Sequence, residues 1–206
     1  MSKPNAGPLA DLKVKNNEEG GLFQVAPTRK LILISGPGGS GKTSLAKRIG
    51  DACSYTVVSE DDYWREFKAN DPQNGLRTLE EERIIQKRVA AEVRSLLEEG
   101  KRVVLEFILY CDPPRPLLAY QEALKGTVSD LLVVLLQPSV DAILARKKRR
   151  GREQEQDAAA EAAIALSQLN CLDSPHIKKE WIVPNGDRGI SETLDWLVRE
   201  NPGFFA

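Results

Sequence analysis

The stretch LILISGPGGSGKT, residues 31–43, decides the fold of this chain. Residues 31–34 form a continuous apolar run, which is typical of a strand buried on both faces of a parallel sheet. Residues 36–43 fit the pattern G-x-x-x-x-G-K-[ST] at every defined position. The glycines let successive backbone N–H groups turn inward around phosphate oxygens, which a Cβ atom would obstruct. A strand, a glycine-rich loop and a helix in this order predict a site for ATP or GTP.

Each residue type in this loop has an expected task. Lys42 can place its ammonium between the β- and γ-phosphates, and the Thr43 hydroxyl can coordinate Mg²⁺. The helix that follows adds the partial positive charge of its N-terminus. An incidental glycine-rich turn is the alternative reading. The residues expected to bind the nucleotide phosphates are Gly36, Gly38, Gly39, Ser40, Gly41, Lys42 and Thr43.

The rest of the chain alternates between apolar runs and helical patterns. Strands are expected at 55–59, 103–109, 131–136 and 181–183, and helices at 42–53, from 78 to Gly100, and at 116–125, 140–149, 157–169 and 191–200. The expected N-caps are Ser139, Ser191 and Thr78, the last in a capping box with Glu81. Such alternation predicts a three-layer α/β fold with a five-stranded, mostly parallel sheet covered on both faces.

Composition restricts the class of protein. The 206 residues suggest one domain, in which residues 1–28 form a flexible tail and residues 29–206 the folded unit. The 29 basic and 30 acidic residues nearly cancel, which argues against a surface coated in positive charge for nucleic acid. No apolar run reaches the roughly 18 residues that a membrane span needs. Three cysteines and one histidine give no disulfide framework or zinc site, so a cytoplasmic location is expected.

Two acidic sites lie where the second and third predicted strands end. Residues 59–64, SEDDYW, follow the second strand, and Glu106 lies in the third. Ligands of open α/β sheets bind at the carboxyl ends of strands. We expect Asp61 to accept the proton of a substrate hydroxyl, a solvated turn being the alternative. Glu106 is expected to hold Mg²⁺ or a substrate hydroxyl, because a charge in an apolar strand is costly unless it is paired.

A basic block, RKKRRGR, occupies residues 146–152. Such a run is usually a solvated helix face or a weak nucleic-acid patch. After the fourth strand it is better interpreted as part of a helical lid, residues 146–170, whose arginines close over the nucleotide. We expect Arg149 and Arg152 to act in this way. Tyr63, Trp64 and Tyr110 are candidate walls of the substrate pocket, or else core aromatics.

At this point the chain resembles the uridine kinase and nicotinamide riboside kinase group of P-loop kinases. The similar elements are EDDYW at 60–64, LEFIL at 105–109, RGRE at 150–153 and IVPNG at 182–186. The resemblance implies a P-loop kinase fold with Asp61 as catalytic base and Glu106 as the strand-three acid. It also implies that Arg152 reaches nucleotide and substrate and that the turn holding Asn185 lies beside the adenine.

The chain departs from that group in two places. Phe107 replaces the glycine that normally follows the strand-three acid. The segment between Asp61 and Glu106 is too short for the β-hairpin that holds the nucleoside in uridine kinases, so uridine is disfavoured. Antibiotic phosphotransferases and gluconate-type kinases are compact at this place as well, and they remain open as relatives.

These observations predict an ATP- and Mg²⁺-dependent kinase that phosphorylates a hydroxyl of a small metabolite, such as a nucleoside-like molecule, a sugar or an antibiotic. Its catalytic residues would be Lys42, Asp61, Glu106 and Arg152. No nucleic-acid or membrane partner is expected, and the oligomeric state is not indicated. The alternatives are a regulatory ATPase that acts through a protein partner, for which no acceptor pocket would lie beside Asp61, and an RNA-end kinase.

Overall fold

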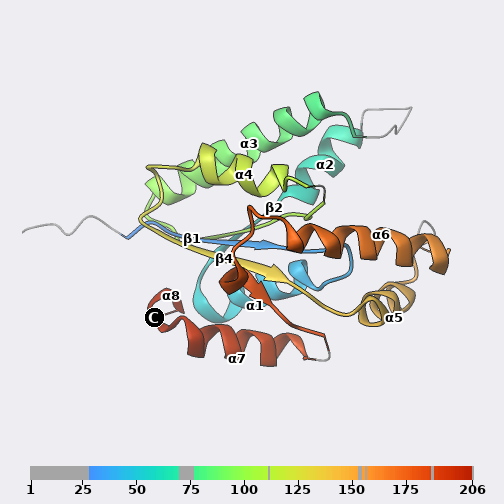
Figure 1. Ribbon diagram of the computed structural model, residues 1–206. Helices are drawn as coiled ribbons and strands as arrows, with labels where there is room; N and C mark the ends of the chain where they lie inside the picture. Colours follow the sequence, from blue (N-terminus) through green and yellow to red (C-terminus); the bar gives the residue numbers. More distant parts are fainter. Residues whose placement is uncertain are drawn as a thin grey trace, which may run out of the picture.

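A computed structural model describes residues 28–69, 77–110, 112–152, 155, 157–186 and 188–205. The predicted flexible tail, residues 1–28, lies outside this range except for Thr28. One sheet of five strands runs through the centre of the molecule in the order β2-β3-β1-β4-β5, and every strand pair is parallel (Figure 1). The strands are β1 (Lys30–Ser35), β2 (Thr56–Ser59), β3 (Val103–Glu106), β4 (Asp130–Leu136) and β5 (Ile182–Val183).

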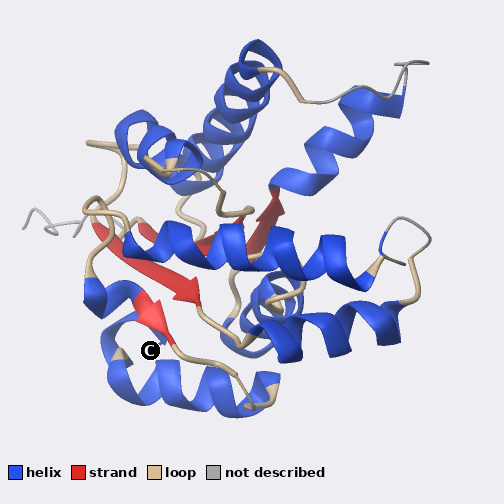
Figure 2. Ribbon diagram, turned by 45° about the vertical axis from the view of Figure 1, so that its right-hand side comes forward, coloured by secondary structure: helices blue, strands red, loops and turns tan. Residues whose placement is uncertain are grey.

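Helices cover both faces of the sheet and its carboxyl edge (Figures 1 and 2). One face carries α2 (Glu60–Ala69), α3 (Leu79–Glu98) and α4 (Arg115–Ala123), and the other carries α1 (Lys42–Cys53), α7 (Ile190–Glu200) and α8 (Pro202–Phe205). Two neighbouring helices, α5 (Val140–Arg150) and α6 (Ala158–Asn170), lie beyond the carboxyl ends of the strands. Two short 3₁₀ helices, Cys171–Asp173 and Lys179–Trp181, precede β5. The predicted three-layer α/β fold is therefore confirmed.

The central strand β1 explains why both layers form. Its side chains alternate between two cores: Leu31 and Leu33 face the α3 side, and Ile32 and Ile34 face the α1 side. All four are at most 1% exposed. A strand with no solvent-facing side chain needs a helical layer on each face, which the α/β connections supply. In the described part of the chain, no helix combines the length and the apolar character required to cross a bilayer.

Three local predictions are wrong. Residues 60–69 form helix α2 where a strand end and loop were expected; its first turn holds three acids, which suit the positive end of a helix dipole. Strand β3 ends at Glu106, although the amides of Phe107 and Leu109 still donate to carbonyls of residues 34 and 36. Helix α7 begins at Ile190, so Ser191 is inside it, and its N-terminus is capped by Glu192, which accepts from the Gly189 amide at 2.8 Å.

The capping box of α3 is confirmed and gives a test of stability. The Glu81 amide donates to Thr78 Oγ1 at 3.2 Å, and the Thr78 amide donates to Glu81 Oε2 at 2.7 Å. We expect T78A to lower the free energy of unfolding by about 1 kcal/mol, because an N-terminal donor of the helix loses its acceptor. T78S keeps the hydroxyl and is the matched control. Urea denaturation checks this, and equal stability of T78A and T78S would contradict it.

Candidate active site

The phosphate loop, residues 36–43, joins β1 to α1 at the carboxyl edge of the sheet. Gly36 has a φ of +146°, and a Cβ atom there would lie 2.8 Å from the Leu136 carbonyl oxygen, so only glycine fits. Lys42 is 9% exposed, and its Nζ donates to the Pro37 carbonyl at 2.9 Å. Burial lowers the pKa of Lys42, an effect that the carboxylates of Glu106 and Asp61 oppose. The lysine is thus held inside the loop that it is expected to serve.

Two residues hold the loop from the side of the β5–α7 connection. Asn185 is 1% exposed, and its Nδ2 donates to the Ser40 carbonyl at 3.0 Å. Arg146 donates through Nη1 to the same carbonyl at 3.0 Å and through Nη2 to the Gly186 carbonyl at 3.1 Å. Neither the Asn185 side chain nor the buried Ser40 hydroxyl lines the cavity described below. The Asn185 side chain thus supports the loop, and the place of its turn beside the adenine stays a prediction.

Glu106 lies at the end of β3 and is 2% exposed. Its Oε1 accepts hydrogen bonds from Thr43 Oγ1, at 3.1 Å, and from Ser59 Oγ. Ser59 was not predicted as a site residue. It lies opposite Glu106 in the parallel register of β2 and β3. This register, together with the acid in an apolar strand, is the signal that could have identified Ser59.

The donor set at Glu106 fits Mg²⁺. Carboxylate and hydroxyl oxygens are ligands of hard cations, and Mg²⁺ usually keeps several waters and takes only one or two carboxylates. Within the described residues there is no group of three or more His, Cys, Asp or Glu side chains that could form a full protein cage for a metal. Thr43 and Glu106, the predicted pair, lie within hydrogen-bond distance of each other and next to the phosphate loop.

Asp61 lies in the first turn of α2, and its side chain is 60% exposed. Arg77 approaches Asp61 Oδ1 at 3.8 Å, and its guanidinium lies 4.4 Å from the centre of the Trp64 ring. Two cavities meet here, one of about 1030 Å³ over the phosphate loop and one of about 850 Å³ beside α2. We call them the loop cavity and the α2 cavity. The residues that line both are Thr43, Asp61, Arg77 and Arg152.

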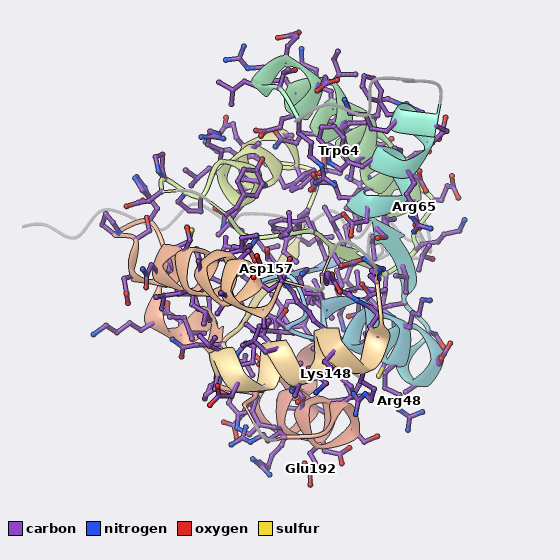
Figure 3. All side chains as sticks on the ribbon, turned by 90° about the vertical axis from the view of Figure 1, so that its right-hand side faces the viewer. Arg48, Trp64, Arg65, Lys148, Asp157 and Glu192 are labelled. Carbon is purple, nitrogen blue, oxygen red and sulfur yellow. The ribbon has the colours of Figure 1, made fainter. Side chains whose placement is uncertain are left out.

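The loop cavity is strongly basic. Arg149, Arg150 and Arg152 of the predicted lid line it. Lys148 of α5, labelled in Figure 3, does not. Its cationic lining residues are Lys42, Arg77, Arg146, Lys147, Arg149, Arg150, Arg152 and Arg188, against the carboxylates of Asp61, Glu155 and Glu161. An excess of this size suits a polyanion such as a triphosphate. The alternative of a solvated helix face is thereby disfavoured for most of the basic block.

Lys147 is a residue that sequence analysis missed. It is 6% exposed and pairs with Glu161 of α6, while another α6 side chain, Gln168, accepts from the Gly38 amide at 2.8 Å. In the sequence Lys147 is one of six basic residues in the block 146–152, and nothing local separates it from the others. Only the packing of α6 on the loop distinguishes it.

The predicted aromatic walls divide into two groups. Trp64 lines the α2 cavity, although it is 3% exposed and largely part of the core. Tyr63 packs against the α3-side core and Tyr110 lies beside Arg115; neither lines the two cavities. The assignment of Tyr63 and Tyr110 to the substrate pocket stays a prediction. For Tyr63 the alternative of a core aromatic has support, because Tyr63 and Asp61 point to different sides of α2.

Glu60, beside Asp61, provides a pH-dependent test of this region. It is 3% exposed, its Oε1 accepts from Trp64 Nε1 at 2.9 Å, and burial raises its pKa above the ordinary value of 4.5. The fold therefore favours the protonated carboxyl, and stability is lost as the pH rises from 4.5 to the raised pKa. E60Q keeps the acceptor oxygen and removes this dependence.

We expect E60Q to gain stability relative to the wild type as the pH rises above 4.5, because only the wild type must bury a charge there. Chemical denaturation at a series of pH values measures the difference. D62N changes a neighbouring, exposed carboxylate and is the matched control. A difference between E60Q and wild type that stays constant with pH would contradict the assignment of a raised pKa.

Comparisons with known proteins agree with this architecture. A family described as "AAA domain" matches residues 31–175. A gluconokinase from Arabidopsis thaliana is 28% identical over 139 residues, which are 62% of this chain and 70% of that protein. A cytidylate kinase from Haloarcula marismortui is 37% identical over 79 residues, which are 37% of this chain and 41% of that protein.

A solved structure gives the same fold. The crystal structure of a sugar kinase from Janibacter sp. HTCC2649 superposes with a TM-score of 0.61 at 16% identity, covering 84% of this chain and 94% of the other. At this identity the likeness concerns the fold alone. The sequence match covers the loop, the sheet through β4, and helices α5 and α6. The chain belongs to the AAA domain family.

Proposed function

We propose that this protein is an ATP- and Mg²⁺-dependent kinase that transfers the γ-phosphoryl group to a hydroxyl of a small metabolite. One observation carries the proposal: Asp61 lies where the loop cavity and the α2 cavity meet, so a nucleotide and an acceptor can reach the same carboxylate. The relatives are a gluconokinase and a cytidylate kinase, which confirms the prediction of a small-molecule kinase. A regulatory ATPase would not need the second cavity.

Each group of the site has a role in the transfer. Lys42 and the loop amides bind the phosphates, while Arg149 and Arg152 bring positive charge from the proposed lid of α5 and α6. Thr43 and Glu106 would hold Mg²⁺, which neutralises charge on the phosphate oxygens when it is bound. Asp61 accepts the proton of the acceptor hydroxyl. The hydroxyl oxygen then bonds to the γ-phosphorus as the bond to the bridging oxygen breaks and ADP leaves.

The α2 cavity indicates the chemistry of the acceptor. Its described lining residues include five cations, Lys47, Arg65, Lys68, Arg77 and Arg152, and three carboxylates, Asp61, Asp62 and Glu106. Arg65 pairs with Asp62, and Lys68 pairs with Glu81 of α3. With Glu106 assigned to the metal and Asp61 to the proton, Lys47, Arg77 and Arg152 favour an acceptor that carries a carboxylate. A sugar acid fits this description and agrees with the name of the Arabidopsis relative.

The resemblance to the uridine kinase and nicotinamide riboside kinase group stays a prediction, as do the cytoplasmic location and the absence of a nucleic-acid partner. The roles of the individual residues are likewise proposals. Their support is the geometry around Thr43, Asp61 and Glu106.

D61N tests the proposed base. It keeps the size of the side chain and removes the proton acceptor, so we expect turnover with ATP, Mg²⁺ and a sugar-acid acceptor to fall by about 100-fold or more. ATP binding, measured by calorimetry, should change little. D62N, at the exposed neighbouring carboxylate, is the control. Unchanged turnover in D61N would remove Asp61 from this role.

R77Q tests the acceptor class. We expect the KM for gluconate to rise by about 10-fold, because a charge-assisted hydrogen bond to the carboxylate is lost. The KM for sorbitol, the neutral polyol of the same chain length, should change much less. R83Q removes an arginine of α3 that lines neither cavity and is the control. An equal rise for both acceptors would contradict an anionic substrate. In a separate measurement, high-affinity, salt-sensitive binding of RNA ends would favour the RNA-end kinase alternative.

A further inference from the structure

Helix α6 contacts the phosphate loop through side chains that the proposed mechanism does not use. Gln168 Oε1 accepts a hydrogen bond from the Gly38 amide at 2.8 Å. Seven residues earlier, which is two helical turns, Glu161 pairs with Lys147 of α5. The two contacts place one face of α6 against the loop. They also connect α5, α6 and the loop in one network.

Lys147 lies directly on the glycines of the loop. A Cβ atom on Gly39 would lie 3.3 Å from Lys147 Cγ and 3.4 Å from its Cε, and one on Gly38 would lie 3.7 Å from Lys147 Nζ. The aliphatic part of the side chain therefore runs along Gly39, and its ammonium ends at Gly38. Gly39 also has a φ of +86°, so the loop at this point accommodates glycine and the lysine together.

Two ammonium groups consequently border the same cavity. Lys147 and Lys42 both line the loop cavity, and both are at most 9% exposed. Burial lowers the pKa of Lys42, and the positive charges of Arg150 and Lys147 lower it further. Like charges that border one cavity repel each other, and an anion bound between them relieves this repulsion. A phosphate group bound by the loop is such an anion.

We propose that Lys147 is a further catalytic residue of this kinase, which contacts the transferring phosphoryl group opposite Lys42, and that Glu161 is the positioning residue that holds its ammonium at Gly38. The proposal rests on the proposed function. An ammonium has three donors, so one can serve Glu161 while two remain for phosphoryl oxygens. Glu161 is 8% exposed, and a buried carboxylate needs such a partner.

Lys147 thereby differs from the other cations of the basic block. Although it belongs to the proposed lid, its ammonium already lies at the loop in this structure. Arg150, by contrast, pairs with Glu155, and Arg146 donates to backbone carbonyls. Because Lys147 lies against the loop itself, it is the residue of the basic block best placed to contact the third phosphate of ATP, which ADP lacks.

The full-length chain with Mg²⁺ provides the test, using K147M, E161M and the double variant K147M/E161M. K148M makes the same change at the next residue of α5, which is exposed and lines neither cavity, and is the matched control. Calorimetry measures the affinities for a non-hydrolysable ATP analogue and for ADP. Steady-state kinetics separate kcat from the KM for ATP, and thermal denaturation reports the fold.

We expect K147M and the double variant to bind the ATP analogue about 10-fold more weakly, with the ADP affinity within about twofold of wild type, because one charge-assisted contact to the third phosphate is lost. In both, kcat falls by about 100-fold at saturating ATP, as expected for a group that stabilises transition-state charge. In the double variant the thermal stability returns to near that of wild type, because no unpaired charge stays buried. E161M lowers kcat while Lys147 is still present.

A purely structural ion pair predicts the opposite result. The double variant would then fold and retain wild-type kcat and wild-type discrimination between the ATP analogue and ADP, which would overturn the proposal. If the double variant does not fold, K147Q is measured by the same two affinities, and equal weakening for both nucleotides overturns the proposal as well. The two affinities need no acceptor, so they remain decisive even if wild type phosphorylates no tested metabolite, a result that would count against the proposed function instead.

Discussion

The buried carboxylate of Glu106 is the group on which the arrangement of this site depends. It ends an apolar strand in the middle of the sheet, where an unpaired charge would be costly. Thr43 from the start of α1 and Ser59 from the end of β2 donate to one of its oxygens. Three elements that are distant in sequence therefore meet at one atom, at the carboxyl edge of the sheet. The phosphate loop and Asp61, which directly follow β1 and β2, are brought to the same edge.

The two cavities follow from that meeting point. The loop cavity opens toward α5, α6 and the connection before α7, and the α2 cavity opens between α1, α2 and Arg77. Asp61 lies at their junction because α2 begins immediately after β2. The charges separate accordingly, with the acids at the strand ends and most cations on the surrounding helices. A formal net charge of −1 for the whole chain conceals this separation.

Much of the architecture could be predicted because its signals are local. A fully buried parallel strand must be apolar throughout, so residues 31–34 revealed β1, and the Thr78 capping box gave the start of α3 within one residue. The phosphate loop was equally readable, since its geometry requires glycine at defined positions. Helix α2 was not predicted, because its acidic first turn resembles a polar loop. The helix nevertheless places the Trp64 ring in the core.

Roles that depend on tertiary contacts could not be predicted from the sequence. The Asn185 amide supports the loop through the Ser40 carbonyl, a contact between residues 145 positions apart that no local pattern indicates. Lys147 could not be separated from its basic neighbours without knowing that Glu161 packs against it. Tyr63 and Trp64 are adjacent in sequence, and only the helical turn of α2 separates them: Tyr63 packs against the core while partly exposed, and Trp64 is buried in it and also lines the α2 cavity.

Phosphorus-31 NMR of the wild-type protein with ATP, Mg²⁺ and gluconate observes the transferred group itself. Phosphoryl transfer to a hydroxyl predicts a new phosphomonoester resonance that grows in equal amount with ADP while inorganic phosphate stays at its background level. ADP formed together with inorganic phosphate alone, for gluconate and for every other hydroxylated acceptor tried, would contradict a kinase and identify the protein as a hydrolase of ATP.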